Sequence, residues 1–220
     1  MIGMCTNYAL QMKASEIANF YGVESPDLFI ELYPYRPTKS GAPAKVYNLA
    51  PVILLEDGKR AMKTARWGLL PHWANTDQEP IQPGNAQAES IATKPMFKES
   101  FRKRRCLVPV SSFFEYRTMP TGKSRRRFTL PVPFAFAGIY NVFEDLMTMT
   151  FATVLPSPWF SEVHNRQPAT LTGDEMTQWL NPETSTEQLQ RLLRPWDAVI
   201  AEEDSPKGNK TDQQQKDLFA

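Results

Sequence analysis

The hydrophobic pattern of this chain changes within short stretches, and most of it is typical of strands. Strand-like composition recurs at residues 5–10, 51–55, 60–68, 105–117, 125–140 and 146–155. The Asp57-Gly58 pair between the second and third stretches predicts a tight hairpin, because both residues tolerate a positive φ. The fourth stretch predicts two short strands with a break near Ser111.

Helical spacing occurs in a few short segments, such as the one in which Ile17, Phe20 and Tyr21 share one face. Three short helices are expected, at residues 15–23, 172–180 and 185–193, with Ser15, Thr172 and either Ser185 or Thr186 as N-caps. Residues 33–48 are rich in proline and are expected to form a loop, and 19 prolines in the chain argue against a regular α/β alternation. We predict an α+β fold with a curved, mainly antiparallel β-sheet core and short flanking helices.

The length of 220 residues and the 41% share of hydrophobic residues are enough for one large domain or two small ones. The chain turns polar at Asp197, so we expect one domain at residues 1–196 and a polar, disordered tail at residues 197–220. No run of 18 apolar residues and no signal-peptide pattern is found, so we expect a cytoplasmic protein without a membrane partner.

The chain has only two cysteines and two histidines, which limits the metal and redox chemistry that it can support. Cys5 and Cys106 are expected to be free thiols in a reducing compartment. Together with His72 and His164 they could supply four zinc ligands, but their spacing does not suggest that the four converge. Neither a metal nor a cofactor is therefore expected.

The net charge of +1 hides an uneven distribution of charge. Residues 197–220 hold six acidic and three basic residues, so the rest of the chain carries a net charge of +4. The basic excess gathers in two clusters, which are Lys98 with Arg102, Lys103, Arg104 and Arg105, and Lys123 with Arg125, Arg126 and Arg127. Such clusters suggest a polyanionic partner, although two solvated loops would explain the charge equally well.

Several polar side chains stand where their neighbours do not explain them. Asn85 and Glu89 follow a Pro-Gly turn, Glu115 interrupts an aromatic run, and His164 follows a proline-rich loop. A carboxylate set among Phe and Tyr side chains would be desolvated, which raises its pKa and suits it to proton transfer. Taken singly, each has an ordinary explanation: an outward-facing strand glutamate, a surface histidine, or for Cys5 a small apolar core residue.

Taken together, these positions carry a resemblance to a known family. The segments MCTNY, YNLAP, RWGLLPHW, NAQAES, MFKESFRKRRCLVPVSSFFEYR and VHNRQPATL occur in this order. The series resembles the SRAP family, the abasic-site-processing proteins that are also called SOS-response-associated peptidases. The resemblance runs from Cys5 to about Leu193. It implies an SRAP-like fold, a role in the DNA damage response, and abasic single-stranded DNA near the nucleoid as the partner.

The family resemblance also implies a role for each site residue. Cys5, as the N-terminal residue, would form a covalent cross-link to the abasic site. Asn85 would orient the sugar or the N-terminus, Glu115 would move protons during ring opening and closure, and His164 would be a second acid–base group. Trp73 would stack on bases, and Gln87 and Arg166 stand within the matching motifs as further DNA-binding positions. Three more DNA-binding residues are expected from the charge pattern and not from the family, namely Arg125, Arg126 and Arg127.

The cross-link chemistry explains why the cysteine must be N-terminal. An open abasic deoxyribose presents an aldehyde, and an α-amine with a pKa near ~7.7–8.0 is partly neutral and able to form a Schiff base with it. The thiol of the same residue can then close a five-membered thiazolidine ring. Cys5 meets this condition only if residues 1–4 are absent, by a translation start at Met4 or by self-cleavage. We favour the start at Met4.

The chain departs from the family pattern at two DNA-facing positions. The family usually has Cys-Gly-Arg where this chain has Cys5-Thr6-Asn7, and Asn-Ala-Arg where it has Asn85-Ala86-Gln87. Both missing arginines would be phosphate contacts, so DNA affinity is expected to be weaker or carried by the basic clusters.

Two other functions and one further partner also fit the sequence. A cysteine peptidase or autopeptidase would use Cys5 and His164, and a non-covalent single-strand binder would need neither. The tail ends in QKDLF, in which Gln215, Leu218 and Phe219 resemble a bacterial sliding-clamp-binding pentapeptide, although Lys216 departs from the usual leucine. A clamp is therefore an expected second partner.

Overall fold

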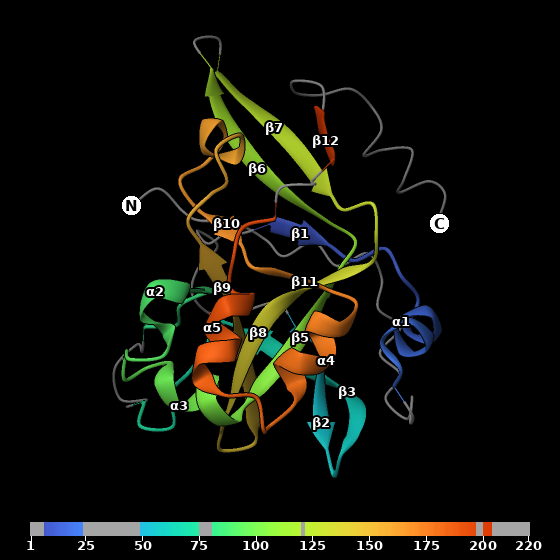
Figure 1. Cartoon of the computed structure of the whole chain (residues 1–220), viewed down its shortest axis with the longest axis vertical. Coiled ribbons are helices and arrows are strands. Elements are labelled where there is room, and N and C mark those ends of the chain that lie inside the picture. Colours follow the sequence, from blue (N-terminus) through green and yellow to red (C-terminus); the bar gives the residue numbers. More distant parts are fainter. Residues whose placement is uncertain (1–6, 24–48, 75–80, 120–121, 197–199, 204–220) are drawn as a thin grey trace.

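Five strands of this chain pair into a closed ring. The structure is a computed structural model, and it describes residues 7–23, 49–74, 81–119, 122–196 and 200–203 (Figure 1). The ring strands are β2 (Leu49–Glu56), β3 (Lys59–Trp67), β5 (Arg105–Val110), β8 (Phe134–Phe143) and β9 (Leu146–Val154). They pair in the order β9, β3, β2, β5 and β8, and a pairing of β8 with β9 closes the path. All of these pairs are antiparallel except β3 with β9.

Three short strands extend this ring. β4 (Asn85–Gln87) and β10 (Gln167–Pro168) lie along β9, and β11 (Thr170–Thr172) lies along β8. The β2–β3 hairpin turns at Asp57 and Gly58, whose φ angles are +50° and +79°, as the sequence predicted.

A second sheet packs against the ring and carries the long hairpin seen at the top of Figure 1. Its strands pair in the order β1 (Asn7–Ala9), β6 (Ser112–Met119), β7 (Gly122–Thr129) and β12 (Ile200–Glu203). The strands β5 and β6 are separated at Ser111, which confirms the predicted break. One face of each sheet contributes to a shared aromatic core, in which Tyr8, Phe113 and Phe128 of the second sheet meet ring residues such as Phe136 and Phe151.

The helices cover the other face of the ring. They are α1 (Ala14–Tyr21), α2 (Ala88–Ile91), α3 (Lys98–Lys103), α4 (Asp174–Leu180) and α5 (Thr186–Leu192). The 3-10 turn η1 (Phe160–Glu162) instead contributes Phe160 to the aromatic core. Successive strand residues point to opposite faces, so Val52 and Leu54 join the aromatic core while Ile53 packs under the helices. The α+β class and the curved, mainly antiparallel sheet are thereby confirmed.

Two of the predicted N-cap residues are wrong, because these helices begin at other residues than expected. Helix α1 is capped at Lys13, not Ser15, because the Glu16 carboxylate accepts the Lys13 backbone N–H at 2.7 Å. Helix α4 is capped at Gly173, and Thr172 instead donates its backbone N–H to Glu175 at 3.0 Å. Ser185 caps α5 as predicted, since its hydroxyl accepts the Gln188 N–H at 3.2 Å. Helices α2 and α3 were not predicted, because each is too short to show a helical period.

Ordered structure continues beyond the predicted domain boundary at residue 196. Strand β12 pairs with β7 in a register that sets Glu202 opposite Arg127 and Glu203 opposite Arg126. Backbone pairing with the open edge of β7 accounts for a strand in a segment expected to be disordered. The helices in the described part of the chain include no candidate membrane span. The predicted loop at residues 33–48 and the clamp-like end of the tail lie outside the described ranges.

Candidate active site

Asn85 stands at the start of β4, on the edge of the ring. This strand runs parallel to β9, with Asn85 opposite Phe151. The preceding Gly84 carbonyl accepts the Trp67 indole N–H at 2.6 Å, and a Cβ at Gly84 would lie 3.3 Å from that indole nitrogen. Trp67 thus fixes the turn that delivers Asn85, whose side chain is buried.

Glu115 faces inward from β6. It shares the core-facing side of that strand with Phe113, and only 4% of Glu115 is exposed. The register sets it opposite Arg126 of β7, so the two side chains leave the sheet on the same face. An outward-pointing strand glutamate is therefore ruled out, and the carboxylate is buried, whereas its neighbours Phe114 and Tyr116 leave the strand on the opposite face.

His164 follows η1 and is held by the backbone two residues further on. Its Nδ1 atom lies 3.1 Å from both the backbone nitrogen and the backbone oxygen of Arg166. The N–H can serve an unprotonated Nδ1 and the carbonyl a protonated one, so Nδ1 keeps a partner in either state. The other ring nitrogen, Nε2, is buried and makes no hydrogen bond to any residue in the described ranges.

Three segments far apart in sequence converge here through aromatic packing. Tyr8 of β1 packs against Phe151, the β9 residue opposite Asn85, with ring centroids 6.3 Å apart. Phe113, two residues before Glu115, packs at 6.2 Å against Phe160 of η1, whose carbonyl accepts the His164 N–H. The segments that carry Glu115 and His164, and the strand β9 that pairs with the Asn85 segment, therefore contribute to one aromatic core together with Tyr8 of β1.

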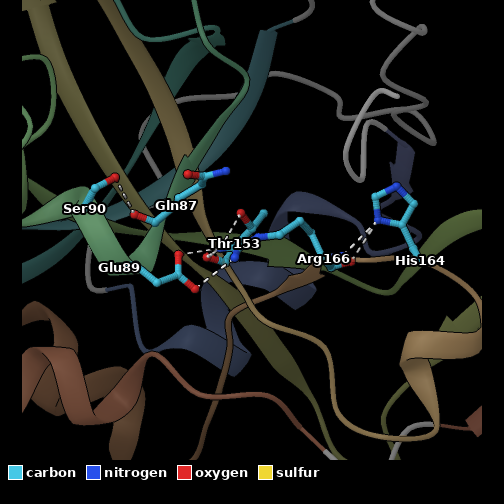
Figure 2. A network of polar contacts seen from close by, with 6 residues as sticks. All are labelled: Gln87, Glu89, Ser90, Thr153, His164 and Arg166. Atoms are coloured by element: carbon cyan, nitrogen blue, oxygen red, sulfur yellow. Dashed lines mark hydrogen bonds and ion pairs between the residues drawn. The ribbon is translucent and has the colours of Figure 1, made fainter. Parts of the chain in front are cut away.

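A network of polar contacts joins α2, β9 and the His164 loop (Figure 2). The guanidinium of Arg166 makes two hydrogen bonds with the Glu89 carboxylate, at 2.8 and 2.9 Å, and donates to the Thr153 carbonyl. Figure 2 shows Arg166 between Glu89 on one side and His164 on the other. Hydrogen bonding from Arg166 holds the pKa of Glu89 below its usual value, so this carboxylate is ionised at neutral pH.

Comparison with known proteins now places the chain. Residues 4–204 match the profile of the family described as SOS response associated peptidase (SRAP). The chain belongs to the SRAP family. It is 32% identical to the abasic site processing protein YoqW of Bacillus subtilis, over 94% of this chain and 96% of that protein. The abasic site processing protein YobE of the same species is 34% identical, over 89% and 90%.

More distant SRAP relatives extend to vertebrates. The abasic site processing protein HMCES of Gallus gallus is 26% identical over 73% of this chain and 59% of its own length. A crystal structure of a Bacteroides thetaiotaomicron protein superposes with a TM-score of 0.75 at 26% identity, covering 96% of this chain and 94% of its own. The resemblance read from the sequence is thereby confirmed, and the SRAP-like fold with it.

The predicted DNA-binding residues of this SRAP chain fall into different environments. Trp73 is 56% exposed and Gln87 is exposed, as a side chain that contacts DNA requires. Arg166 is only 7% exposed, and its guanidinium is engaged by Glu89 and Thr153. Its predicted contact with a phosphate is not tested by this arrangement and stays a prediction. Cys5 lies outside the described residues.

The arginine triplet of β7, which is Arg125, Arg126 and Arg127, is split between the two faces of the sheet, because side chains alternate along a strand. Arg126 leaves the sheet on the face of Glu115, while Arg125 and Arg127 leave it on the opposite face. There, the Arg125 guanidinium lies 5.0 Å from the centre of the Phe114 ring, and Arg127 donates to Gln11 at 3.4 Å. The triplet is therefore not a single patch, and Arg125 and Arg127 are the pair that shares a face.

The first basic cluster is partly structural. Arg105 is buried, and its guanidinium donates to the backbone carbonyls of Trp179 at 2.7 Å, Phe101 at 3.0 Å and Asn181 at 2.8 Å. These bonds satisfy carbonyls at the C-terminal ends of α3 and α4. Arg105 is consequently unavailable to a phosphate, which the run of basic residues in the sequence did not reveal.

Cys106 and Glu89 complete the inventory of the site region. Cys106 is a fully buried free thiol on β5, and burial raises its pKa. Within the described ranges, no group of three His, Cys, Asp or Glu side chains is arranged to hold a metal ion. Glu89 was noticed in the sequence but was given no role, because its partner Arg166 lies 77 residues away.

Proposed function

We propose that this protein processes abasic sites in single-stranded DNA by forming a thiazolidine between Cys5 and the open sugar aldehyde. The observation that carries the proposal is that Asn85, Glu115 and His164 are buried on segments adjoining the aromatic core, which Tyr8 of β1 also joins, and β1 begins at Asn7. Only Thr6 lies between Cys5 and Asn7, so the chain limits the distance between their Cα atoms to about 7 Å. The SRAP relatives named above are all called abasic site processing proteins, which supports the same substrate.

The cross-link forms in two steps that release one water molecule. The α-amine of Cys5 adds to the aldehyde carbon, and the carbinolamine loses water to give an iminium. The thiolate then adds to the iminium carbon and closes the ring. A general acid is needed when the hydroxyl group leaves as water, and a base is needed when the thiol loses its proton.

Glu115 and His164 are suited to these proton transfers. Both are buried, and the Nε2 atom of His164 has no partner among the described residues. We assign Glu115 to proton transfer at the amine and the carbinolamine, and His164 to the sugar hydroxyl and to cross-link reversal. Asn85 has an amide that both donates and accepts, so it would orient the sugar or the N-terminal amine.

The exposed residues would hold the strand on either side of the abasic site. Trp73 offers a ring for base stacking, and Gln87 replaces a charged contact with a neutral one. Arg125 and Arg127 would supply part of the phosphate affinity that the missing arginines would otherwise provide. Affinity for intact DNA is accordingly modest and depends on salt.

A peptidase reaction is the second candidate, because the family description itself names a peptidase. Attack by the Cys5 thiol on the carbonyl carbon of the bond before it, with His164 as base, would free the α-amine and form a thioester, and hydrolysis of this thioester by water would release residues 1–4. The same removal would follow from a start at Met4 and loss of that methionine. In either case an amine is exposed on Cys5, without which the thiazolidine cannot form.

A denaturing gel with abasic and intact oligonucleotides tests the proposal. Protein whose N-terminus is verified by intact mass to be Cys5 should give a shifted band with abasic DNA only. A Cys5→Ser variant keeps the amine but loses the thiol, so its adduct should survive the gel only after borohydride reduction of the Schiff base. An equal yield of stable adduct from a chain with an uncleavable leader would refute the thiazolidine. Cleavage of peptides without DNA would favour the peptidase.

A further inference from the structure

Glu89 is a carboxylate that the proposed chemistry does not use, yet it is joined to His164 through one residue. We propose that Glu89 is a positioning residue for His164, acting through Arg166. This inference rests on the proposed function, because it concerns the same acid–base group. The pairing spans three parts of the chain, which are α2, β10 with its preceding loop, and β9 (Figure 2).

Glu89 and Arg166 form a bidentate ion pair. Nη1 and Nη2 of the guanidinium bind the two carboxylate oxygens at 2.8 and 2.9 Å, so the two planar groups fix each other's orientation. Nη2 also donates to the carbonyl of Thr153, a backbone atom of the ring strand β9. Arg166 is 7% exposed, so these contacts hold a buried cation to both the sheet and α2.

The Glu89–Arg166 ion pair is connected to His164 through the main chain of Arg166. The same residue whose guanidinium is fixed supplies the N–H and the carbonyl that lie 3.1 Å from His164 Nδ1. A rotation of the backbone at residue 166 would therefore move both partners of the imidazole together. Holding Arg166 in place orients the ring and keeps Nε2 directed at one point, as catalysis by a positioned group requires.

A direct contact with DNA does not explain why a carboxylate stands at residue 89. Glu89 is the more exposed partner, with 48% of its side chain accessible, so an arriving phosphate would meet a carboxylate first. The charge of Glu89 would repel DNA, and its presence beside the site is explained by its hold on Arg166.

Cross-linking rates test the proposal against a merely structural role. Glu89→Gln keeps the shape but not the charge, and it should slow adduct formation at saturating abasic DNA by about 10- to 100-fold, as expected for a misplaced reacting group. Its affinity for intact single strands should not fall. Glu89→Asp retains the charge and should recover part of the rate. Glu187→Gln removes an exposed pair with Arg191 and is the matched control, which should react like the parent.

Histidine NMR reads the position of the ring directly and needs no DNA. The chain has two histidines, so ¹⁵N-histidine labelling of the full chain gives two sets of ring signals, and exposed His72 is the internal reference. In the parent, the His164 nitrogen shifts should differ from those of His72, because Nδ1 is hydrogen-bonded to Arg166. In Glu89→Gln they should move toward the His72 pattern, while in Glu187→Gln they should not move.

The two experiments separate this inference from the proposed function. A parent protein that forms no adduct would refute the proposed function, while the NMR comparison would still decide whether Glu89 positions His164. Unchanged His164 shifts and an unchanged rate in a folded Glu89→Gln protein would overturn the inference. Thermal unfolding establishes the fold of each variant, and if Glu89→Gln does not fold, the same comparison is made with Glu89→Asp.

Discussion

Glu115 and His164 are buried titratable side chains contributed by segments that meet only in the folded molecule. We predict that Glu115→Gln and His164→Ala each slow cross-linking by about 10²–10⁴-fold, the usual contribution of general acid–base catalysis. Binding of intact single-stranded DNA should change far less, because neither side chain is exposed to the strand. Single-turnover rates and anisotropy titrations measure the two effects. Parent rates of cross-linking and reversal in both variants would show that these roles are wrong.

Cys106 makes a prediction about alkaline pH. Burial raises the pKa of its thiol above the ordinary value of 9.0, so above that pH the unfolded chain loses a proton that the folded chain keeps. The contribution of this thiol to the free energy of unfolding should be fully present below pH 9.0. At higher pH the free energy of unfolding should fall, by up to about 1.4 kcal/mol per pH unit. Cys106→Ala should remove this slope.

The window for that measurement is narrow, because Tyr21 is also buried with a raised pKa and adds a loss of its own above its ordinary value of 10.0. Urea unfolding of the parent and Cys106→Ala between these two pH values isolates the thiol. The comparison concerns slopes, since the alanine also leaves a cavity that lowers stability at every pH. Equal slopes in the two proteins would contradict the account.

At the scale of the element, strand β7 separates three consecutive arginines by face. Arg125→Gln with Arg127→Gln should weaken DNA binding and lower the log–log salt slope by roughly 0.7 for each lost phosphate contact. Arg126→Gln should leave that slope near the parent value and act on the cross-linking rate, because the register sets Arg126 opposite Glu115. Titrations at several salt concentrations decide this. An equal effect of all three arginines on the slope would mean that the strand face does not matter.

At the scale of the whole molecule, the chain carries a second candidate contact beyond the described residues. We predict that its last ten residues bind a bacterial sliding clamp, with Leu218 and Phe219 in an apolar pocket and Gln215 at its rim. Binding to a clamp would raise the local concentration of the protein where single-stranded DNA arises. Anisotropy of the labelled peptide should show saturable binding, which Leu218→Ala with Phe219→Ala should abolish. Binding that survives this double change would leave the tail without a partner.

The sequence by itself determined the local features of this protein. The Asp57-Gly58 turn, the break at Ser111 and the Ser185 cap follow from backbone preferences of a few adjacent residues, and all three are present. The order of short segments also identified the SRAP family, because a series of weak matches at compatible spacing is specific when taken together. Residue types were enough to name Asn85, Glu115 and His164 as candidates.

Only the tertiary structure decided which way these side chains face and what they touch. Glu115 points inward because β6 packs its Phe113 face on the ring, and Arg105 and Arg166 are buried because carbonyls and a carboxylate from distant segments receive them. Strand β12 exists because β7 has an open edge to pair with. Burial and partnership depend on contacts between residues far apart in the chain, and such contacts have no signature in the spacing of neighbouring residues.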